Sequence, residues 1–302
     1  MYDILIIGAG PAGVSAAVYA ASRGRTVLLI EKSKVGGLVG NVSSVTHYAS
    51  VDGDETGASF AEKLSDQLTR YPTIETVFGT VESVDMEGDI KRVIADTGAY
   101  EGKRLIIAAG CAPRKLHVPN EDRLAGHGVD LNAPRDAERY RGKNIYVVGG
   151  ADGAIKEALY LADFAKKLTI IHWEDQIGCI AEFKDRLAQL GNVEYRLHAR
   201  LAAVDGADEV ESLVLRDEHT GDEETIADPG CGIFIYAGTV PNTQGLEALG
   251  LQDGFIPVNE KMETTIAGVY AAGDIRAKQV RQASTAVSDG TIAAINASAS
   301  LK

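Results

Sequence analysis

Short apolar runs, each closed by a glycine-containing turn, alternate along the chain with stretches in which small or apolar residues recur at helical spacing. An apolar run that is too short for a helix and ends at glycine is typical of a buried parallel strand. Strands and helices that alternate in this way predict βαβ units and therefore an α/β fold. The runs and helical stretches lie in residues 2–20, 26–32, 100–116, 144–161, 168–179, 230–243 and 264–297.

The first of these units, DILIIGAGPAG, carries a full dinucleotide-binding fingerprint, GAGPAG over residues 8–13. Gly8 makes the turn, Gly10 lets the backbone approach a pyrophosphate, and Gly13 lets the helix pack closely on the strand. The helix N-terminus offers free N–H groups to the phosphates. Glu31, 18 residues beyond Gly13 at the end of the next strand, can accept hydrogen bonds from ribose hydroxyls. A carboxylate there would repel a 2′-phosphate, so FAD or NAD fits better than NADP.

The second unit, NIYVVGGADGAIKEALYL, repeats the strand, turn and helix, but its turn reads GGADGA over residues 149–154. Ala151 stands where the fingerprint has its second glycine. A methyl group there crowds the approach of a pyrophosphate, and it also costs about 1 kcal/mol or more if φ is positive. The two turns therefore predict two nucleotide-binding folds that do not bind the same ligand.

Five ordered motifs, GAGPAG, AAGCAPRKL, VGGADGA, GTVPNT and AAGDIR, span the chain from Asp3 to about Ala297. As a set they resemble the low-molecular-weight thioredoxin reductase family of FAD-dependent pyridine-nucleotide oxidoreductases. The resemblance implies an α/β fold of two Rossmann-like, three-layer nucleotide-binding domains, the second inserted into the first. Residues 1–114 and 244–302 would form the discontinuous FAD-binding domain, and residues 115–243 the inserted NAD(P)-binding-like domain. A homodimer is expected.

The resemblance also implies which residues contact FAD. Asp274 would hold the ribityl chain, and Arg281 with its two successors would bring backbone and side chains to the flavin ring. The loop of residues 35–50 would pass beside the ring, where His47 and Tyr48 could touch it or pack on a partner subunit instead. The predicted FAD-binding residues are Gly8, Gly10, Pro11, Ala12, Gly13, Glu31, Lys32, Gly37, Leu38, His47, Ala109, Gly110, Asp274, Arg281, Gln282 and Ala283.

Two departures from that family change the expected chemistry. Where disulfide-active members carry C-x-x-C, residues 132–135 read Asn-Ala-Pro-Arg. Thiol–disulfide exchange needs a thiolate, so reduction of thioredoxin by the family's dithiol mechanism is not expected. NADPH-using relatives read H-R-R-x-x-x-R, but here His172 is followed by Trp173 and Glu174, and Gly178 replaces the last arginine. A 2′-phosphate would meet carboxylates in place of arginines, which disfavours NADPH in the usual pose.

Three occupants of the second groove remain open. NADH could bind with Glu174 on its ribose hydroxyls. The groove could be unused, with FAD reduced by a protein donor, as in ferredoxin-dependent flavin thioredoxin reductases, which have similarly lost the pyridine-nucleotide motifs. A different nucleotide, even a second flavin, could stack on Trp173, although plain packing also explains that residue. The groove residues are Gly149, Gly150, Ala151, Asp152, Trp173 and Glu174.

Composition and charge narrow the partners. A net charge of −13 argues against wide contact with nucleic acid or anionic membrane, and no apolar run reaches the ~18–20 residues of a membrane span. The apolar N-terminus lacks a basic start and breaks at Gly8, so a cytoplasmic location without a signal peptide is expected. Cys111, Cys179 and Cys231 lie far apart, which predicts neither a disulfide framework nor a metal site.

Charge also bears on a protein donor. Ferredoxins are usually acidic, so docking would need a local basic patch. The candidates are Arg135, Arg139, Arg141, Lys143, Lys166 and Lys167, which a solvated surface also explains. Ten acids and one arginine between Asp205 and Asp228 predict a solvated hairpin surface.

The sequence therefore predicts an FAD-dependent oxidoreductase that has no active-site dithiol, no catalytic acid or base and no metal. NADPH is not its expected donor; ferredoxin and NADH are the alternatives. The competing hypothesis is a flavin-binding regulatory or scaffold protein with a degenerate second nucleotide site, which could hold a second flavin.

Overall fold

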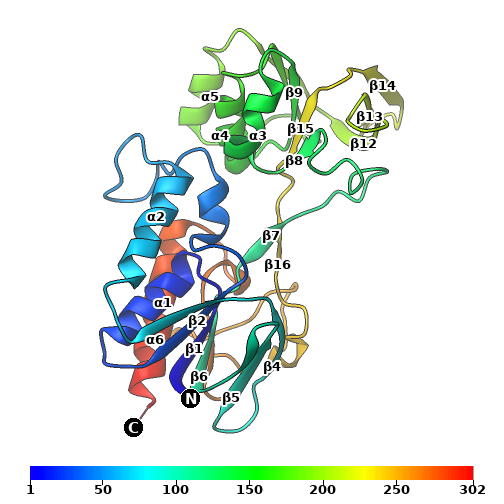
Figure 1. Cartoon of the computed structure of the whole chain (residues 1–302). Helices are drawn as coiled ribbons and strands as arrows, with labels where there is room; N and C mark the ends of the chain where they lie inside the picture. The colour runs from blue at the N-terminus through cyan, green and yellow to red at the C-terminus, as the bar shows by residue number, and fades with distance from the viewer. Residues whose placement is uncertain (302) are drawn as a thin grey trace. The chain divides into compact units, whose positions relative to one another are not determined.

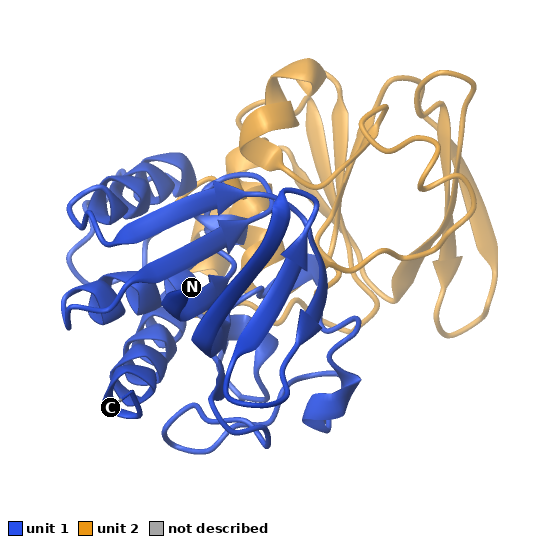
Figure 2. Cartoon of the chain, turned by 60° about the horizontal axis from the view of Figure 1, so that its bottom comes forward, with its two compact units in different colours: residues 1–40, 45–112, 240–302 blue, residues 41–44, 113–239 orange. Residues whose placement is uncertain are grey.

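The computed structural model describes residues 1–301 and divides into two compact units (Figures 1 and 2). Unit 1 contains Met1–Gly40, Val45–Ala112 and the chain from Val240 onward, and unit 2 contains Asn41–Ser44 and Pro113–Thr239. Two short paired strands, β7 (Cys111–Pro113) and β16 (Thr239–Pro241), lie where the chain passes between the units. Unit 2 is therefore almost entirely an insertion into unit 1. Within residues 1–301 no helix has the length and apolarity to cross a membrane.

Unit 1 is built on a seven-stranded sheet of order β3-β2-β1-β6-β5-β4, with β17 paired to β6 as well. Strands β1, β2, β3, β6 and β17 pair in parallel, while β4 and β5 add an antiparallel edge. The strands are β1 (Tyr2–Ile7), β2 (Val27–Glu31), β3 (Ile74–Phe78), β4 (Val81–Asp85), β5 (Lys91–Ala95), β6 (Gly98–Ile107) and β17 (Val269–Ala271). The helices are α1 (Pro11–Ala21), α2 (Gly57–Leu68) and α6 (Ala283–Ala299), with the 3₁₀ turns η1 (Gly37–Asn41), η3 (Glu247–Leu249) and η4 (Gly273–Ile275).

Small residues let α1 and α6 pack directly against each other. A Cβ built on Gly290 of α6 would lie 2.0 Å from the carbonyl oxygen of Ala12 in α1, so only glycine fits at that position. Ser15 of α1 adds a polar link, since its hydroxyl donates to the carbonyl of Val287 at 2.9 Å. This contact joins the first and last helices of the chain.

We expect Gly290→Ala to lower the free energy of unfolding by roughly 1–3 kcal/mol, because the added methyl must push α6 away from α1. Denaturant unfolding followed by circular dichroism measures the change. Ser288→Ala, at an exposed position of the same helix, is the matched control and should change stability by less than about 0.5 kcal/mol. Equal stabilities for the two variants would contradict the packing argument.

Unit 2 combines a parallel sheet of order β11-β10-β9-β15-β8 with an antiparallel sheet of order β12-β13-β14. Its strands are β8 (Val129–Asp130), β9 (Asn144–Val148), β10 (Lys167–Ile171), β11 (Val193–Arg196), β12 (Ala199–Asp205), β13 (Ser212–Asp217), β14 (Glu223–Ala227) and β15 (Gly232–Ile235). Its helices are α3 (Ala133–Asp136), α4 (Asp152–Leu161) and α5 (Ala181–Leu187), and the 3₁₀ turn η2 (Ala137–Tyr140) directly follows α3.

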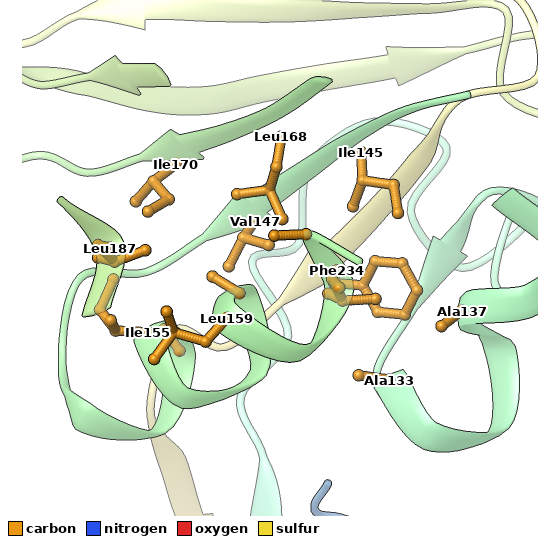
Figure 3. Packing of buried hydrophobic residues seen from close by; sticks show 14 of the residues in the cluster. Ala133, Ala137, Ile145, Val147, Ile155, Leu159, Leu168, Ile170, Leu187 and Phe234 are labelled. Atoms are coloured by element: carbon orange, nitrogen blue, oxygen red, sulfur yellow. The ribbon is translucent and has the colours of Figure 1, made fainter. Parts of the chain in front are cut away.

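The central strands of unit 2 are buried on both faces, which explains their continuous apolar sequences. Ile145 and Val147 of β9 face the helices and pack with Ile155 and Leu159 of α4 (Figure 3). The alternate residues of the same strand, such as Tyr146, pack on the other side with the antiparallel sheet. This makes three layers, and it places the turn after β9 at the carboxyl edge of the parallel sheet, where such folds bind ligands.

Candidate flavin and nucleotide sites

The first glycine turn is shaped by two positions that only glycine can occupy. Gly8 has φ +97°, and a Cβ there would lie 2.4 Å from the carbonyl oxygen of Ala108. A Cβ on Gly13 would lie 1.8 Å from the carbonyl oxygen of Gly8 itself. The first strand can therefore turn sharply into α1, with the helix start pressed against the strand end.

Gly10 differs from its neighbours because nothing in the chain requires it to be glycine. Its φ of −71° and ψ of −177° suit any residue, and the nearest atom to an added Cβ is the carbonyl oxygen of Gly36, 4.0 Å away. α1 begins at Pro11 with no side-chain cap, so its first N–H groups face the same open space. Open space beside an uncapped helix N-terminus is what a pyrophosphate needs.

Glu31 is held in place beside this turn. Its Oε2 accepts a hydrogen bond from the backbone N–H of Ala9 at 2.7 Å, and its Oε1 accepts one from Ser33 at 3.0 Å. Each carboxylate oxygen keeps a further lone pair for a ribose hydroxyl. The backbone N–H of Gly36 donates to the carbonyl of Ala9 at 2.8 Å, so the segment after β2 is also tied to the turn.

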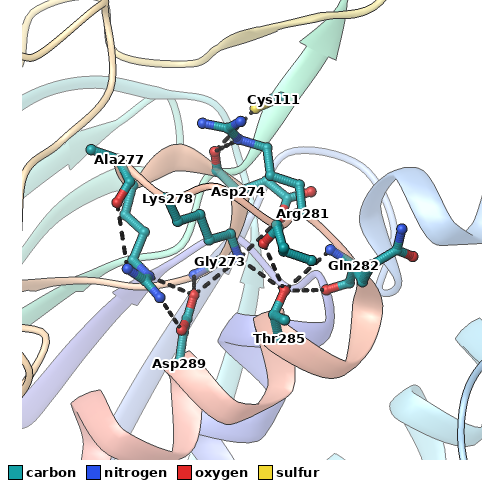
Figure 4. Close-up of polar contacts among 11 residues, drawn as sticks. Cys111, Gly273, Asp274, Ala277, Lys278, Arg281, Gln282, Thr285 and Asp289 are labelled. Carbon is teal, nitrogen blue, oxygen red and sulfur yellow. Dashed lines mark hydrogen bonds and ion pairs between the residues drawn. The ribbon is translucent and has the colours of Figure 1, made fainter. Parts of the chain in front are cut away.

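Asp274 lies in η4, which begins the C-terminal part of the candidate flavin site (Figure 4). Its Oδ1 is buried and accepts no hydrogen bond; the ammonium of Lys278 lies 3.3 Å away. The backbone carbonyl of Asp274 accepts weak hydrogen bonds from the Cys111 thiol at 3.3 Å and from Nε of Arg281 at 3.4 Å. The Lys278 ammonium stabilises this oxygen, and the Asp274 side chain as a whole is 37% exposed. The carboxylate can therefore accept a hydrogen bond from a ribityl hydroxyl.

Asp289 is a positioning residue beside the candidate site that the sequence motifs did not reveal. Its buried carboxylate accepts two hydrogen bonds from the Arg276 guanidinium, at 2.7 and 2.8 Å, one from Lys278 at 3.1 Å and one from the N–H of Gly273 at 3.1 Å (Figure 4). These bonds hold η4 against α6 and so fix the position of Asp274. The available signal was a lone acid within an apolar, small-residue helix.

We expect Asp274→Ala to weaken FAD binding roughly 10- to 100-fold, the range given by the loss of a hydrogen bond to a charged group. Fluorescence titration of the FAD-free protein measures the dissociation constant. Asp274→Asn keeps an acceptor oxygen and should lose less affinity, and Glu62→Ala, at an exposed position of α2, should lose none. Unchanged flavin affinity in Asp274→Ala would remove this residue from the site.

The remaining predicted flavin contacts fall into two groups. The first group lies against the glycine turn. A Cβ built on Gly37 would lie 3.3 Å from Gly10, and a Cβ built on Gly273 of η4 would lie 2.8 Å from Ala12. Arg281 lies with its guanidinium 3.9 Å from the Phe255 ring centre. Asn242 donates hydrogen bonds to the carbonyls of Ala109 and Gly110, while Gln282 is the N-cap of α6 and Ala283 its first residue. The second group, Lys32, Leu38 and His47, is exposed, and Thr46 Oγ1 lies 3.2 Å from His47 Nδ1.

The second glycine turn resembles the first at its opening glycine and at its helix N-cap. Gly149 has φ +136°, and a Cβ there would lie 2.4 Å from the carbonyl oxygen of Tyr236. Ala151 has φ −86° and ψ 172°, in the same region as Gly10, so its backbone carries no strain. The methyl of Ala151 instead occupies the kind of open space that Gly10 leaves. Of the two effects predicted for Ala151, backbone strain is therefore absent, and steric crowding of a pyrophosphate remains.

Strand register shows which residue of unit 2 corresponds to Glu31. Gly8 N donates to Ile30 and Gly149 N donates to Ile171, so His172 follows its strand as Glu31 follows β2. The His172 ring is buried over Gly150, where an added Cβ would lie 2.6 Å from it. Its Nε2 lies 3.1 Å from Oε2 of Glu174.

Charge at the groove is also unfavourable for phosphates. Asp152 occupies the first turn of α4, and its Oδ1 accepts a hydrogen bond from Ile180 N at 2.8 Å. An acid at this position uses the partial positive charge that a pyrophosphate would otherwise meet. Trp173 is 49% exposed, with the Arg200 guanidinium 4.8 Å from its ring centre, so its indole is already stacked by a cation.

The segment in which the sequence predicts the loss of the family's dithiol, residues 132–135, contains the start of a short helix. Asn132 caps α3, its Oδ1 accepting from the N–H of Arg135 at 3.1 Å. All three cysteines are buried, and none forms a disulfide within residues 1–301. Burial raises the pKa of the Cys231 thiol to about 12 and also raises that of Cys179, so both stay protonated and unreactive near neutral pH.

The predicted basic patch is largely neutralised by neighbouring acids. Arg135 forms a bidentate pair with Asp136 at 2.8 Å, and Arg141 forms one with Glu138 at 2.7 Å. Arg139 lies 3.6 Å from Asp130, Lys167 lies 3.3 Å from Glu194, and the other candidates are Lys143 and Lys166. This surface attracts an acidic protein less than its sequence suggests.

Comparison with known proteins places these features in one family. The family model described as pyridine nucleotide-disulphide oxidoreductase matches residues 2–290. A thioredoxin reductase of Peptoclostridium acidaminophilum is 36% identical over 303 residues, covering 98% of this chain and 96% of that protein. The crystal structure of Lactococcus lactis thioredoxin reductase superposes with a TM-score of 0.93 at 33% identity, covering 98% of both chains. A ferredoxin-flavin thioredoxin reductase from Clostridium acetobutylicum gives 0.54 at 30% identity, covering 99% and 98%.

The protein is thus an α/β flavoprotein oxidoreductase of the thioredoxin reductase type. It belongs to the pyridine nucleotide-disulphide oxidoreductase family. The predicted fold class, two Rossmann-like domains, is confirmed by these likenesses.

Proposed function

We propose that this chain is an FAD-dependent oxidoreductase that passes electrons through FAD without an active-site dithiol, and that NADPH is not its electron donor. Bound FAD would supply the reversible acceptance and release of electrons. The observation that carries the donor assignment is the pair of side chains after β10, where Trp173 is stacked by Arg200 and Glu174 adds a carboxylate at positions that hold arginines in NADPH-using relatives. The contrast between Gly10 and Ala151, two helix N-caps with the same backbone conformation, supports weaker binding of either pyridine nucleotide to unit 2.

The residues of unit 1 fit FAD. Gly10 leaves open space at an uncapped helix, Glu31 presents carboxylate oxygens that are held by backbone N–H groups, and Asp274 presents a partly exposed carboxylate. These three features match a pyrophosphate, a ribose and a ribityl chain in turn. We propose the full set of sixteen residues named from the sequence as the FAD-binding residues, in a homodimer.

Two donors remain in the proposal. The likeness to a ferredoxin-flavin thioredoxin reductase supports a ferredoxin-like protein donor. NADH is the second candidate, because it lacks the 2′-phosphate that the acids near Trp173 would repel. The paired arginines around Arg135 weaken the argument for an acidic partner on that surface but leave other surfaces of the chain open.

Anaerobic reduction of the purified holoprotein tests the proposal. NADH, NADPH and chemically reduced ferredoxin are each mixed with the protein, and the loss of flavin absorbance is followed. We expect rapid loss with ferredoxin or NADH and slow loss with NADPH. Rapid reduction by NADPH would overturn the donor assignment. Bound FAD that none of the three reduces would favour the regulatory or scaffold alternative, and protein that binds no FAD would refute both.

A further inference from the structure

Three side chains from three separate turns of unit 2 converge on one point of its surface. Asp175 follows β10, His198 lies in the turn between β11 and β12, and His219 lies in the turn between β13 and β14. Nδ1 of His198 lies 2.7 Å from Nε2 of His219 and 3.2 Å from Oδ1 of Asp175. One ligand atom of each residue lies within 4.8 Å of the other two.

The two imidazole rings lie close together. Their centres are 4.2 Å apart and their planes are tilted by 45°. Nε2 of His219 and Nδ1 of His198 share a hydrogen bond, so one of the two nitrogens carries a proton. When that proton moves to the other nitrogen of its ring, both nitrogens have a lone pair that can bind one ion.

The backbone holds the three turns in register without help from these side chains. The N–H of His198 donates to the carbonyl of Glu174 at 3.4 Å, and the N–H of Glu218 donates to the carbonyl of His198 at 2.7 Å. Oδ1 of Asp217 accepts from the N–H groups of His219 and Thr220, at 2.8 and 2.9 Å, which shapes the hairpin turn. These backbone hydrogen bonds therefore keep the three side chains close together in the folded chain.

The surroundings favour a cation. The hairpin that carries His219 lies in the stretch with ten acids and one arginine between Asp205 and Asp228. Excess negative charge raises the local concentration of cations. The Asp175 side chain is 85% exposed and that of His198 33%, so an ion can enter from water and keep water ligands.

We propose that Asp175, His198 and His219 form a binding site for a divalent first-row transition metal ion, with Zn²⁺ as the best match. Two imidazole nitrogens and one carboxylate oxygen, with a water in the fourth position, are an established zinc ligand set. Zinc bonds of 2.0–2.1 Å in tetrahedral geometry place two nitrogens about 3.4 Å apart. The imidazoles therefore separate slightly when the metal takes the place of the hydrogen bond between them. Both rings stay neutral, and each then carries its proton on the nitrogen that does not bind the metal, Nε2 of His198 and Nδ1 of His219.

This site is independent of the flavin chemistry and has a structural consequence. The metal would link three turns that are far apart in the sequence. The prediction of no metal site was made from the spacing of the cysteines and did not include these residues. Asp175 comes directly after Trp173 and Glu174 in the sequence. A bound ion would therefore also restrain the segment after β10 that carries these two residues. A cross-link of this kind stabilises the folded state when metal is present.

Zinc titration of the chelator-treated, full-length protein tests the site, with calorimetry for affinity and Co²⁺ absorption for the ligand set. We expect one Zn²⁺ per chain and an affinity at least tenfold lower in His219→Gln, in His198→Asn and in Asp175→Asn. Asparagine is chosen at position 198 because His198 has φ +54°, which asparagine tolerates.

His127→Gln is the matched control, since it removes an exposed histidine of the same unit away from the cluster. It should bind Zn²⁺ like the unchanged protein. Circular dichroism spectra of all variants show whether they remain folded; His219 is exposed, so its loss leaves the fold intact. Absence of Zn²⁺ binding to the unchanged protein would overturn the proposal, as would equal affinity in His219→Gln and His127→Gln.

Discussion

Gly10→Val should fold but lose most of its FAD. The new side chain points into open space, so the only folding cost is that of a poorer helix N-cap, about 1 kcal/mol. In the holoprotein the same space belongs to the pyrophosphate, which valine would displace from the N–H groups of α1. We expect FAD affinity to fall at least 100-fold, measured by flavin content after purification and by titration of the FAD-free protein.

Two further variants separate cofactor binding from folding. Gly53→Val lies in a loop of unit 1 with nothing within 4 Å of an added Cβ, and it should retain full flavin content. Gly13→Val should fail to fold, because its Cβ would lie 1.8 Å from the carbonyl oxygen of Gly8. Normal flavin content in Gly10→Val would show that no pyrophosphate approaches this turn.

The triple variant Ala151→Gly, Trp173→Arg, Glu174→Arg should gain NADPH-driven flavin reduction, by roughly 10- to 100-fold in rate at limiting NADPH. Glycine restores the space that Gly10 provides in unit 1, and two arginines replace an indole and a carboxylate where a 2′-phosphate would lie. Charge-assisted hydrogen bonds to phosphate are worth about 1.5–3 kcal/mol, which sets the size of the gain. Anaerobic stopped-flow absorbance measures the rate.

Ala151→Gly alone is the matched control for this gain. The pyrophosphate is common to both pyridine nucleotides, so the single change should help NADH and NADPH equally. The two arginines should then raise the NADPH rate selectively. If the triple variant is no faster with NADPH than the unchanged protein, the obstacle lies outside these three positions.

The fold could be predicted from the sequence because each strand–turn–helix unit is specified by residues that are close together in the sequence. The positive φ at Gly8 and Gly149, and the close contact at Gly13, are consequences of fingerprint positions that can be read directly. Side-chain partners were harder. Asp289 lies 15 residues after Asp274 on the chain, and no motif says that it bonds Arg276 and Lys278.

The second groove shows the same limit. The loss of its glycine could be seen in the sequence, but the φ of −86° at Ala151, which removes the expected strain, could not. The His172 ring over Gly150 and the Arg200 guanidinium on Trp173 depend on strand register and on a neighbouring sheet. The pairing of Arg135, Arg139 and Arg141 with acids likewise follows from tertiary structure, and so a run of basic residues overstated the positive surface.

The contact between Gly290 and Ala12 closes unit 1 with the last helix of the chain. During synthesis, residues 113–239 leave the ribosome as one continuous segment and can complete their own core first. The N-terminal strands must wait, because β17, η4 and α6 are still to be made. Asp274 and Arg281 emerge only after all of residues 113–239, so the proposed flavin site can be assembled only once unit 2 has been made.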